Sequence, residues 1–177
     1  KNPSDTNENM PRYWYDKSAS AELYGWENIL QKRSPLIITE GELDRLVLES
    51  NGFAAVSGTG GAGTFKREWA NAISSDTDVY ICFDNDENGA GWKAAEKVAK
   101  LIPHAKLIYL PRNESDKKVD ITDFFTRLEK KVEDFRELMD TAEPLPTDEY
   151  TNNGEIKNEK IIDTLIEIIP AQDFLNG

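Results

Sequence analysis

Three carboxylates follow short apolar runs, and their spacing suits metal-assisted chemistry on phosphates. Glu40 comes directly after the run Leu36–Thr39, and Asp84 and Asp86 follow the run Val79–Phe83. If the two runs are neighbouring parallel strands, about 4.8 Å apart, these side chains converge at one edge of the sheet. Like charges at that distance repel each other unless a cation lies between them. The set therefore predicts Mg²⁺, which takes oxygen ligands and keeps waters for substrate phosphates.

Further acidic residues can reach the same edge. Asp44 lies one helical turn after Glu40, and Asp120 and Asp123 stand before or at the start of the helix expected after the fourth strand. Exposed acidic residues are common in an acidic protein, and a helix N-cap explains Asp123 equally well. The carboxylates that directly follow strands are harder to explain as surface charge.

Composition excludes several classes of chemistry. The chain has 33 acidic and 21 basic residues and a formal net charge of −12, which argues against binding nucleic acid through bulk electrostatics. One cysteine, Cys82, and one histidine, His104, exclude a disulfide framework and a zinc site made by this chain alone. Catalysis would therefore run on carboxylates. We find no signal peptide and no apolar run near the roughly 20 residues that span a bilayer, so we expect a cytoplasmic protein without membrane contact.

Strand and helix patterns alternate four times between residues 36 and 126. The expected strands cover residues 36–39, 53–56, 79–83 and 106–110, and the expected helices cover 42–51, 65–73, 89–101 and 121–128. This alternation predicts an α/β fold with a parallel four-stranded sheet flanked by helices.

The flanking regions differ in composition from this unit. We expect residues 1–35 to be an aromatic-rich lead-in segment with little regular structure, and 127–154 to be a helical extension, with a helix at 132–141, and a linker. Residues 155–177 carry the pattern of an amphipathic helix, and we expect them to be the start of a further, truncated domain. Because the first residue is Lys, we expect a piece of a longer polypeptide.

Three well-known sequence motifs match this chain at the ends of expected strands, but each match is incomplete. Gly58–Gly63 fits the dinucleotide pattern G-x-G-x-x-G, but that pattern normally follows the first strand of its unit. Asp84–Gly89 fits the opening of a calcium loop, but position twelve is Ala95 where a bidentate Glu is needed. The Asp84 and Asp86 pair also matches phosphatases that use one Asp as the nucleophile. Those enzymes usually have a hydroxyl residue soon after the second Asp, and this chain does not.

The order of three motifs resembles the Toprim domain, whose sheet is Rossmann-like. These are EGELD at 40–44, DNDENGAGWKAA at 84–95 and VDITDFF at 119–125. More narrowly, they are similar to the Toprim domains of bacterial-type DNA primases and of phage or plasmid primase-helicases. The likeness covers about residues 36–126, and the stretch 11–29 also resembles the segment that leads into this domain in primases.

The resemblance implies roles residue by residue. Glu40 would be a general acid/base or a metal ligand, and Asp84 and Asp86 would hold divalent metals. Asp44 and Asp120 match further acidic positions of the family. The remaining implied positions are two turn glycines, Gly41 and Gly89, and a basic position at Lys93 that would touch phosphate. We add Lys66 and Arg67 as further candidates for binding phosphate or nucleic acid.

The implied activity is Mg²⁺- or Mn²⁺-dependent nucleotidyl transfer that makes RNA primers on single-stranded DNA. The implied partners are the DNA template, nucleoside triphosphates and a replicative helicase domain in cis or in trans. Two alternatives stay open, a Toprim nuclease and a non-catalytic docking module; a topoisomerase lacks room for its tyrosine domain. The chain also departs from the family, because it has no zinc ligands, no basic subdomain before residue 36, and Lys118 one place earlier than the usual lysine.

Overall fold

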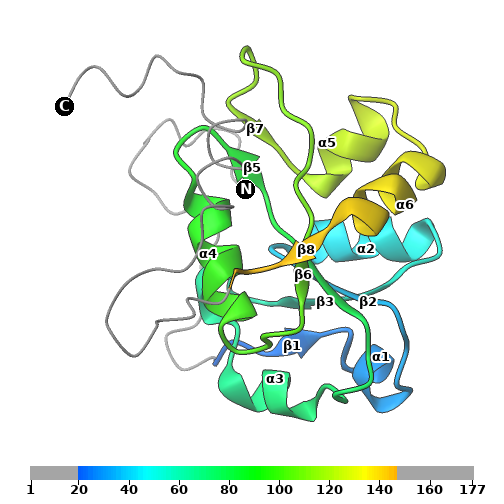
Figure 1. Ribbon diagram of the computed structural model, residues 1–177, viewed down its shortest axis with the longest axis vertical. Coiled ribbons are helices and arrows are strands. Elements are labelled where there is room, and N and C mark those ends of the chain that lie inside the picture. The colour runs from blue at the N-terminus through cyan, green and yellow to red at the C-terminus, as the bar shows by residue number, and fades with distance from the viewer. Residues whose placement is uncertain (1–19, 147–177) are drawn as a thin grey trace, which may run out of the picture.

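The computed structural model describes residues 20–146, which form three layers (Figure 1). A mostly parallel sheet has the order β1-β3-β2-β4-β6-β8, and helices pack on both of its faces. The strands are β1 (Leu23–Tyr24), β2 (Leu36–Thr39), β3 (Ala54–Gly58), β4 (Val79–Cys82), β6 (Lys106–Leu107) and β8 (Glu143–Pro144). The helices are α1 (Trp26–Leu30), α2 (Glu42–Ser50), α3 (Arg67–Ala72), α4 (Ala90–Ala99), α5 (Ile121–Thr126) and α6 (Val132–Thr141).

Burial on both faces explains why the central strands are continuous apolar runs. All residues of β2, β3 and β4 are buried, and alternate side chains enter different halves of the core. Ile38 packs in the half that contains residues of α3 and α4. Ile37, on the opposite face, packs in the half that contains residues of α2, α5 and α6. Within residues 20–146, no helix is both long and apolar enough to cross a membrane.

The expected α/β fold is confirmed, and the four parallel strands β3, β2, β4 and β6 form its centre. The structure adds antiparallel edge strands, since β1 pairs with β3 and β8 pairs with β6. The fourth strand is shorter than expected and ends at Leu107.

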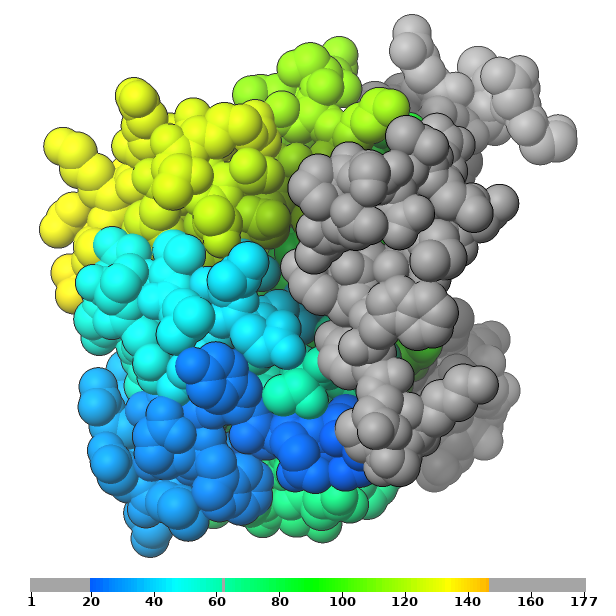
Figure 2. Space-filling model, turned by 180° about the vertical axis from the view of Figure 1, so that it is seen from behind, coloured from blue at the N-terminus to red at the C-terminus, as the bar shows by residue number. Residues whose placement is uncertain are grey.

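The expectation of little regular structure in the lead-in segment is wrong for its described residues, which form β1 and α1. Figure 2 shows this segment lying beside α2 on one face of the molecule. The remaining aromatic residues before position 20 and the expected domain at 155–177 lie outside the described residues. The predicted domain boundaries stay predictions.

A separate two-stranded ladder completes the frame around the strand ends. β5 (Asn85–Asp86) pairs antiparallel with β7 (Lys118–Val119), and Asp86 lies opposite Lys118. Val119 is fully buried in the core, so its neighbour Lys118 points the other way. The ladder thereby brings a lysine next to the residues that follow β4.

Candidate functional site: an acidic strand edge

The carboxyl ends of β2 and β4 place two candidate carboxylates side by side. These strands are parallel neighbours with Thr39 opposite Cys82, so Glu40 and Asp84 leave the sheet at adjacent points. Glu40 Oε2 is buried without a hydrogen-bond partner. Burial and the charge of Asp84 raise the pKa of Glu40 to about 7. A buried, unpaired acceptor oxygen beside a second carboxylate is a strong signal of a place prepared for a cation or a proton.

Asp84 is only partly neutralised by its surroundings. Burial raises its pKa, while a hydrogen bond and an ion pair from Lys118 lower it, and the net shift is upward. Lys118 Nζ contacts Asp84 Oδ2 directly, and the lysine is half-exposed. Burial lowers the pKa of Lys118 and the contact with Asp84 raises it, with an upward net shift. In this structure, a lysine ammonium therefore supplies the positive charge at Asp84.

Asp44 and Asp120 belong to the same acidic edge. Asp44 Oδ1 accepts hydrogen bonds from the backbone N–H and the hydroxyl of Thr122, both at 3.2 Å, which joins α2 to α5. Burial, then the charges of Asp120 and Asp84, raise the pKa of Asp44 to about 6. Asp120 is the N-cap of α5, because its Oδ1 accepts from the backbone N–H of Asp123 at 2.7 Å. The N-cap explanation offered for Asp123 is thus wrong, and the cap lies three residues earlier.

Asp86 is engaged by the start of α4. Its two oxygens accept hydrogen bonds from the backbone N–H groups of Ala90, at 2.9 Å, and Gly91, at 2.7 Å, at the start of α4. Burial alone would raise the pKa of Asp86, but these backbone donors lower it and prevail. Helix N-termini stabilise negative charge in this way. Asp86 is thus engaged by the helix, and its predicted role as a metal ligand stays a prediction.

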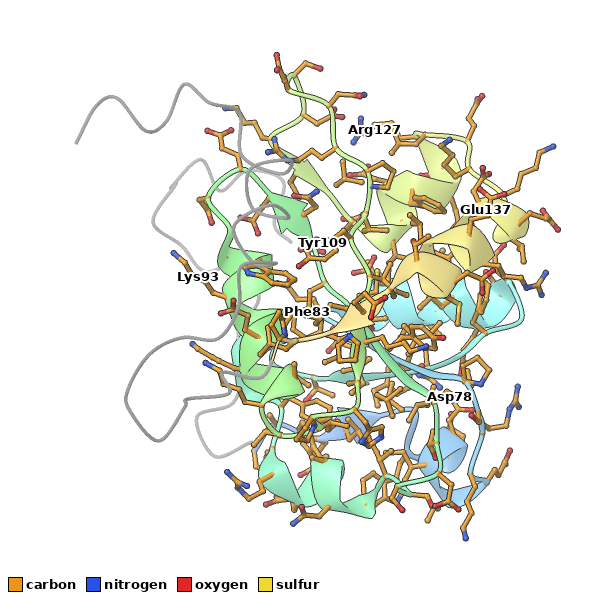
Figure 3. The ribbon with its side chains drawn as sticks, in the orientation of Figure 1. Asp78, Phe83, Lys93, Tyr109, Arg127 and Glu137 are labelled. Atoms are coloured by element: carbon orange, nitrogen blue, oxygen red, sulfur yellow. The ribbon has the colours of Figure 1, made fainter. Side chains whose placement is uncertain are left out.

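The candidate phosphate-binding residues lie on α4 and at the start of α3. Lys93 is exposed on the outer side of α4 (Figure 3). Lys66 precedes α3 and keeps local contacts, with its Nζ 3.9 Å from Glu68 and 5.0 Å from the centroid of the Trp69 ring. Arg67 is exposed at the start of the same helix. Their predicted roles stay predictions.

Glycines allow close approach at the site. Gly89 has a positive φ of 68°, which suits the turn into α4, and a Cβ at Gly41 would lie 3.3 Å from Asp44 Oδ2. Gly91 is more demanding, because a Cβ there would lie 2.1 Å from the backbone oxygen of Asp84. The glycine loop at 58–63 runs through a 3₁₀ turn at Ala62–Thr64 before α3 begins, so its last glycine does not open a helix as the dinucleotide pattern requires.

Sequence reasoning did not assign the roles of Lys118 and Gly91. Because side chains alternate along a strand, Lys118 and Asp120 lie on the same side, opposite Val119. This alternation is the local sequence signal that Lys118 could face the acidic residues. A glycine inside a helix lowers its stability, so its presence there indicates that another group packs closely against the backbone. Gly91, in the first turn of α4, could have been identified by this signal.

The acidic edge fits a cation in part. The unpaired Oε2 of Glu40 and the adjacent Asp84 carboxylate are suitable oxygen donors. Across residues 20–146, however, no three His, Cys, Asp or Glu side chains come together as a ready-made metal site. A further protein ligand would have to come from a rearranged Asp86 or Asp120, while waters complete many magnesium sites.

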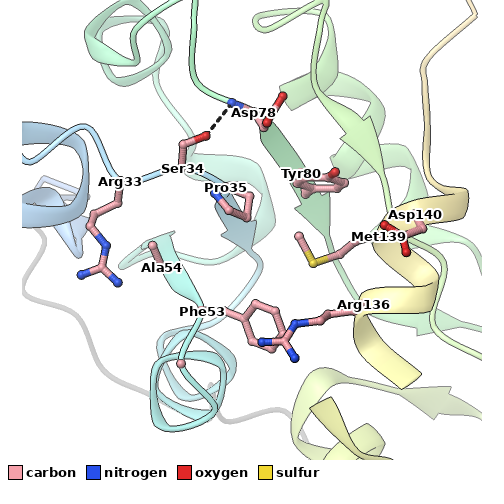
Figure 4. A pocket seen from close by; sticks show the side chains of 11 residues that line it. Arg33, Ser34, Pro35, Phe53, Ala54, Asp78, Tyr80, Arg136, Met139 and Asp140 are labelled. Carbon is pink, nitrogen blue, oxygen red and sulfur yellow. Dashed lines mark hydrogen bonds between the residues drawn. The ribbon is translucent and has the colours of Figure 1, made fainter. Parts of the chain in front are cut away.

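A cavity of about 400 Å³ lies at the end of the strands opposite the acidic edge (Figure 4). Its lining includes Pro35, Phe53 and Asp78, each of which stands immediately before a strand. The backbone N–H of Asp78 donates to Ser34 Oγ at 3.1 Å. None of its lining residues is one of the candidate carboxylates, and we assign it no part in the site.

Comparison with known proteins gives a consistent result. The Toprim-like family model matches residues 37–125. Gene 57 protein of Mycobacterium phage D29 is 31% identical over 104 residues, which cover 59% of this chain and 66% of that protein. The crystal structure of the Aquifex aeolicus primase, with its zinc-binding and RNA polymerase domains, matches with a TM-score of 0.53 and 29% identity, covering 70% of this chain and 30% of that one.

The DnaG primase catalytic domain bound to single-stranded DNA matches with a TM-score of 0.50 and 21% identity, over 84% of this chain and 44% of that one, and supports the fold. The chain spans less than two thirds of the length of each of these relatives. The family model matches half of the chain, and the three motifs of the acidic edge fall inside or at the border of the matched range. The chain belongs to the Toprim-like family, and its fold is that of the Toprim domain of primases.

Proposed function

We propose that this chain is the catalytic Toprim core of a DNA primase or primase-helicase, which joins ribonucleotides into primers on single-stranded DNA. The observation that carries the proposal is the pair of adjacent carboxylates Glu40 and Asp84, with a buried and unpaired oxygen between two strand ends. The family membership and the likeness to the Aquifex aeolicus primase support it. The template, the nucleoside triphosphates and a helicase domain are the proposed partners.

In this proposal Glu40 and Asp84 hold a divalent cation, Mg²⁺ or Mn²⁺. Such a cation would stabilise the negative charge that develops as the 3′-hydroxyl attacks the α-phosphate and pyrophosphate leaves. Glu40 either binds the cation with Asp84 or takes the proton of the hydroxyl, and both roles use its free Oε2. Asp44, held by Thr122, and Asp120, at the start of α5, add negative charge that favours the cation.

The basic residues would act on the phosphates. If a cation replaced it at Asp84, Lys118 would be free to contact a phosphate oxygen, because its side chain is half-exposed. Lys93 on α4, and Lys66 and Arg67 before and in α3, would guide the nucleic-acid backbone. With a net charge of −12 on the whole chain, most of the basic contact to DNA must come from other parts of the assembly.

The test is primer synthesis by the full-length protein on single-stranded DNA with nucleoside triphosphates and Mg²⁺ or Mn²⁺. We expect short RNA products that disappear in Glu40→Gln and in Asp84→Asn. Shortened DNA without RNA products would instead identify a nuclease using the same carboxylates. Calorimetric titration with Mn²⁺ separates either enzyme from a docking module: absence of binding to the wild-type protein would contradict a catalytic role.

A further inference from the structure

A cavity of about 630 Å³ lies directly beside the acidic edge, between α4 and the strands β4 and β6. Its volume is within the usual range for sites that bind small molecules. One end is polar and includes Asp84, Asn85 and Asp86, whereas the other end is apolar and includes Phe83, Trp92 and Leu107. Because Asp84 lines the cavity, a ligand of the acidic edge can extend into it without leaving the protein.

Two aromatic rings form part of the wall. Trp92 on α4 and Tyr109, two residues after β6, are stacked with their ring centroids 4.6 Å apart and an interplanar angle of 26°. Tyr109 is 48% exposed, which leaves part of its ring available to a ligand. Figure 3 shows Phe83 and Tyr109 close to α4. Burial, and then the charge of Glu96, raise the pKa of Tyr109 to about 12, so the phenol stays neutral at any working pH.

The chemistry of the two ends limits the kind of ligand. A flat aromatic heterocycle stacks well on Trp and Tyr, and such stacking tolerates any base because every base has a π-face. The carboxylates at the polar end repel a bare anion, so the anionic part of the ligand needs the cation proposed at Glu40 and Asp84. A nucleotide combines these two properties in one molecule, with a flat base at one end and phosphates at the other.

We propose that the cavity between α4 and β6 binds the base of a nucleotide by stacking on the exposed face of Tyr109, whose other face rests on Trp92, while its phosphates lie at the acidic edge. This inference rests on the proposed function and specifies where the substrate lies. Two polar atoms of the lining already have partners: Asn85 Nδ2 donates to the Leu110 carbonyl at 2.8 Å, and Asn88 Oδ1 accepts from the Ala90 backbone N–H at 3.0 Å.

The experiment separates the base from the phosphates by comparing two probes. The affinities of ATP and of inorganic tripolyphosphate for the full-length protein are measured by calorimetry with Mg²⁺ and without DNA. The variants are Trp92→Leu and Tyr109→Leu, and the matched control is Trp26→Leu on α1, whose ring is 37% exposed and is not in the cavity lining. We expect Tyr109→Leu to weaken ATP binding about tenfold, as for loss of one stacking contact, and to leave tripolyphosphate unchanged. Trp26→Leu should change neither affinity.

Each outcome bears on the inference. Equal affinities of the wild-type protein for ATP and tripolyphosphate would overturn it, as would ATP binding that is unchanged in both cavity variants, even if primer synthesis is observed. ATP binding that depends on Tyr109 in a protein that makes no primers would support the cavity and contradict the proposed function. If Trp92→Leu does not fold, as judged by its thermal transition, the half-exposed Tyr109 provides the decisive variant.

Discussion

Asp44 and Arg45 are neighbours on α2, both are buried, and yet they belong to opposite kinds of charge cluster. Arg45 is satisfied: its Nη2 donates to Glu27 at 2.6 Å and to Glu49 at 2.8 Å, and its Nε donates to the Ala55 carbonyl at 3.1 Å. Asp44 faces Asp120 and Asp84, which carry its own sign.

The two clusters therefore contribute differently to the protein. The Arg45 cluster connects the lead-in segment to the sheet, because Glu27 lies on α1 and the Tyr24 ring lies 4.1 Å below the guanidinium. The acidic edge, in contrast, concentrates like charges and leaves one oxygen without a partner, which costs stability. Natural proteins tolerate such arrangements mainly at functional sites. The comparison predicts that variants of one cluster change stability and variants of the other change activity.

The largest expected effect separates activity from stability. We expect Glu40→Gln to reduce primer synthesis by about 10²–10⁴-fold, because the variant loses a metal ligand or a general base. Its thermal transition should not fall, since the substitution removes the repulsion with Asp84. Primer yield and calorimetric unfolding of the same preparation check this. A variant that unfolds at a clearly lower temperature than the wild type would show that Glu40 stabilises the fold instead.

The converse effect is expected at Arg45, whose side chain is 3% exposed. Arg45→Met should lower the free energy of unfolding by about 2 kcal/mol, because the partly buried Glu49 loses its cation and the Ala55 carbonyl loses one of its donors. Denaturant unfolding measures this loss, and the affinity for Mn²⁺ should stay unchanged. Arg136→Met is the matched control, since Arg136 is exposed on α6 and should lose less than about 1 kcal/mol. Equal losses in the two variants would contradict a special role for the Arg45 cluster.

The pH dependence of stability is expected to come from the acidic edge. The pKa values of Glu40, about 7, and Asp44, about 6, are raised from their usual values of 4.5 and 3.8. Both carboxyls hold protons more tightly in the folded state, so their contribution is complete below their usual pKa values and is lost as pH rises through about 6 and 7. After allowance for partial exposure, we expect a loss of about 1 kcal/mol.

Thermal unfolding in a chelator, followed between about pH 4 and pH 8, measures this slope. The double variant Glu40→Gln and Asp44→Asn should lose most of it. A wild-type protein that becomes more stable across this range would be incompatible with the raised pKa values.

The smallest effect concerns the lysine that contacts Asp84. Lys118→Met removes a cation from a candidate ligand, so the affinity for Mn²⁺ should rise about two- to fivefold, as expected for one partly exposed ion pair. Lys97→Met, an exposed change of the same charge on α4, controls for the net charge of the protein. Weaker Mn²⁺ binding in Lys118→Met would indicate that the lysine supports the cation site and does not compete with it.

Much of the fold could be predicted from the sequence. The bounds of β2 and α6 agree with those expected, and the other central elements differ by a few residues at their ends. The edge strands β1 and β8 and the ladder strands β5 and β7 were not predicted, because runs of two residues have no periodicity to detect. The candidate site was predicted in part: Glu40 and Asp84 lie where the strand ends indicated, whereas the engagement of Asp86 by the first backbone N–H groups of α4 was not expected.

The sequence by itself determined the alternation of strands and helices and the carboxylates that follow β2 and β4. Both depend on local properties, namely hydrophobic periodicity and the residue type at the end of a run. Only the tertiary structure decided which charges meet. Thr122 reaches Asp44 across 78 positions, and Lys118 reaches Asp84 through the β5–β7 ladder. Such partners are selected by packing of distant segments, and the burial that raises the pKa of Glu40 exists only once those segments have come together.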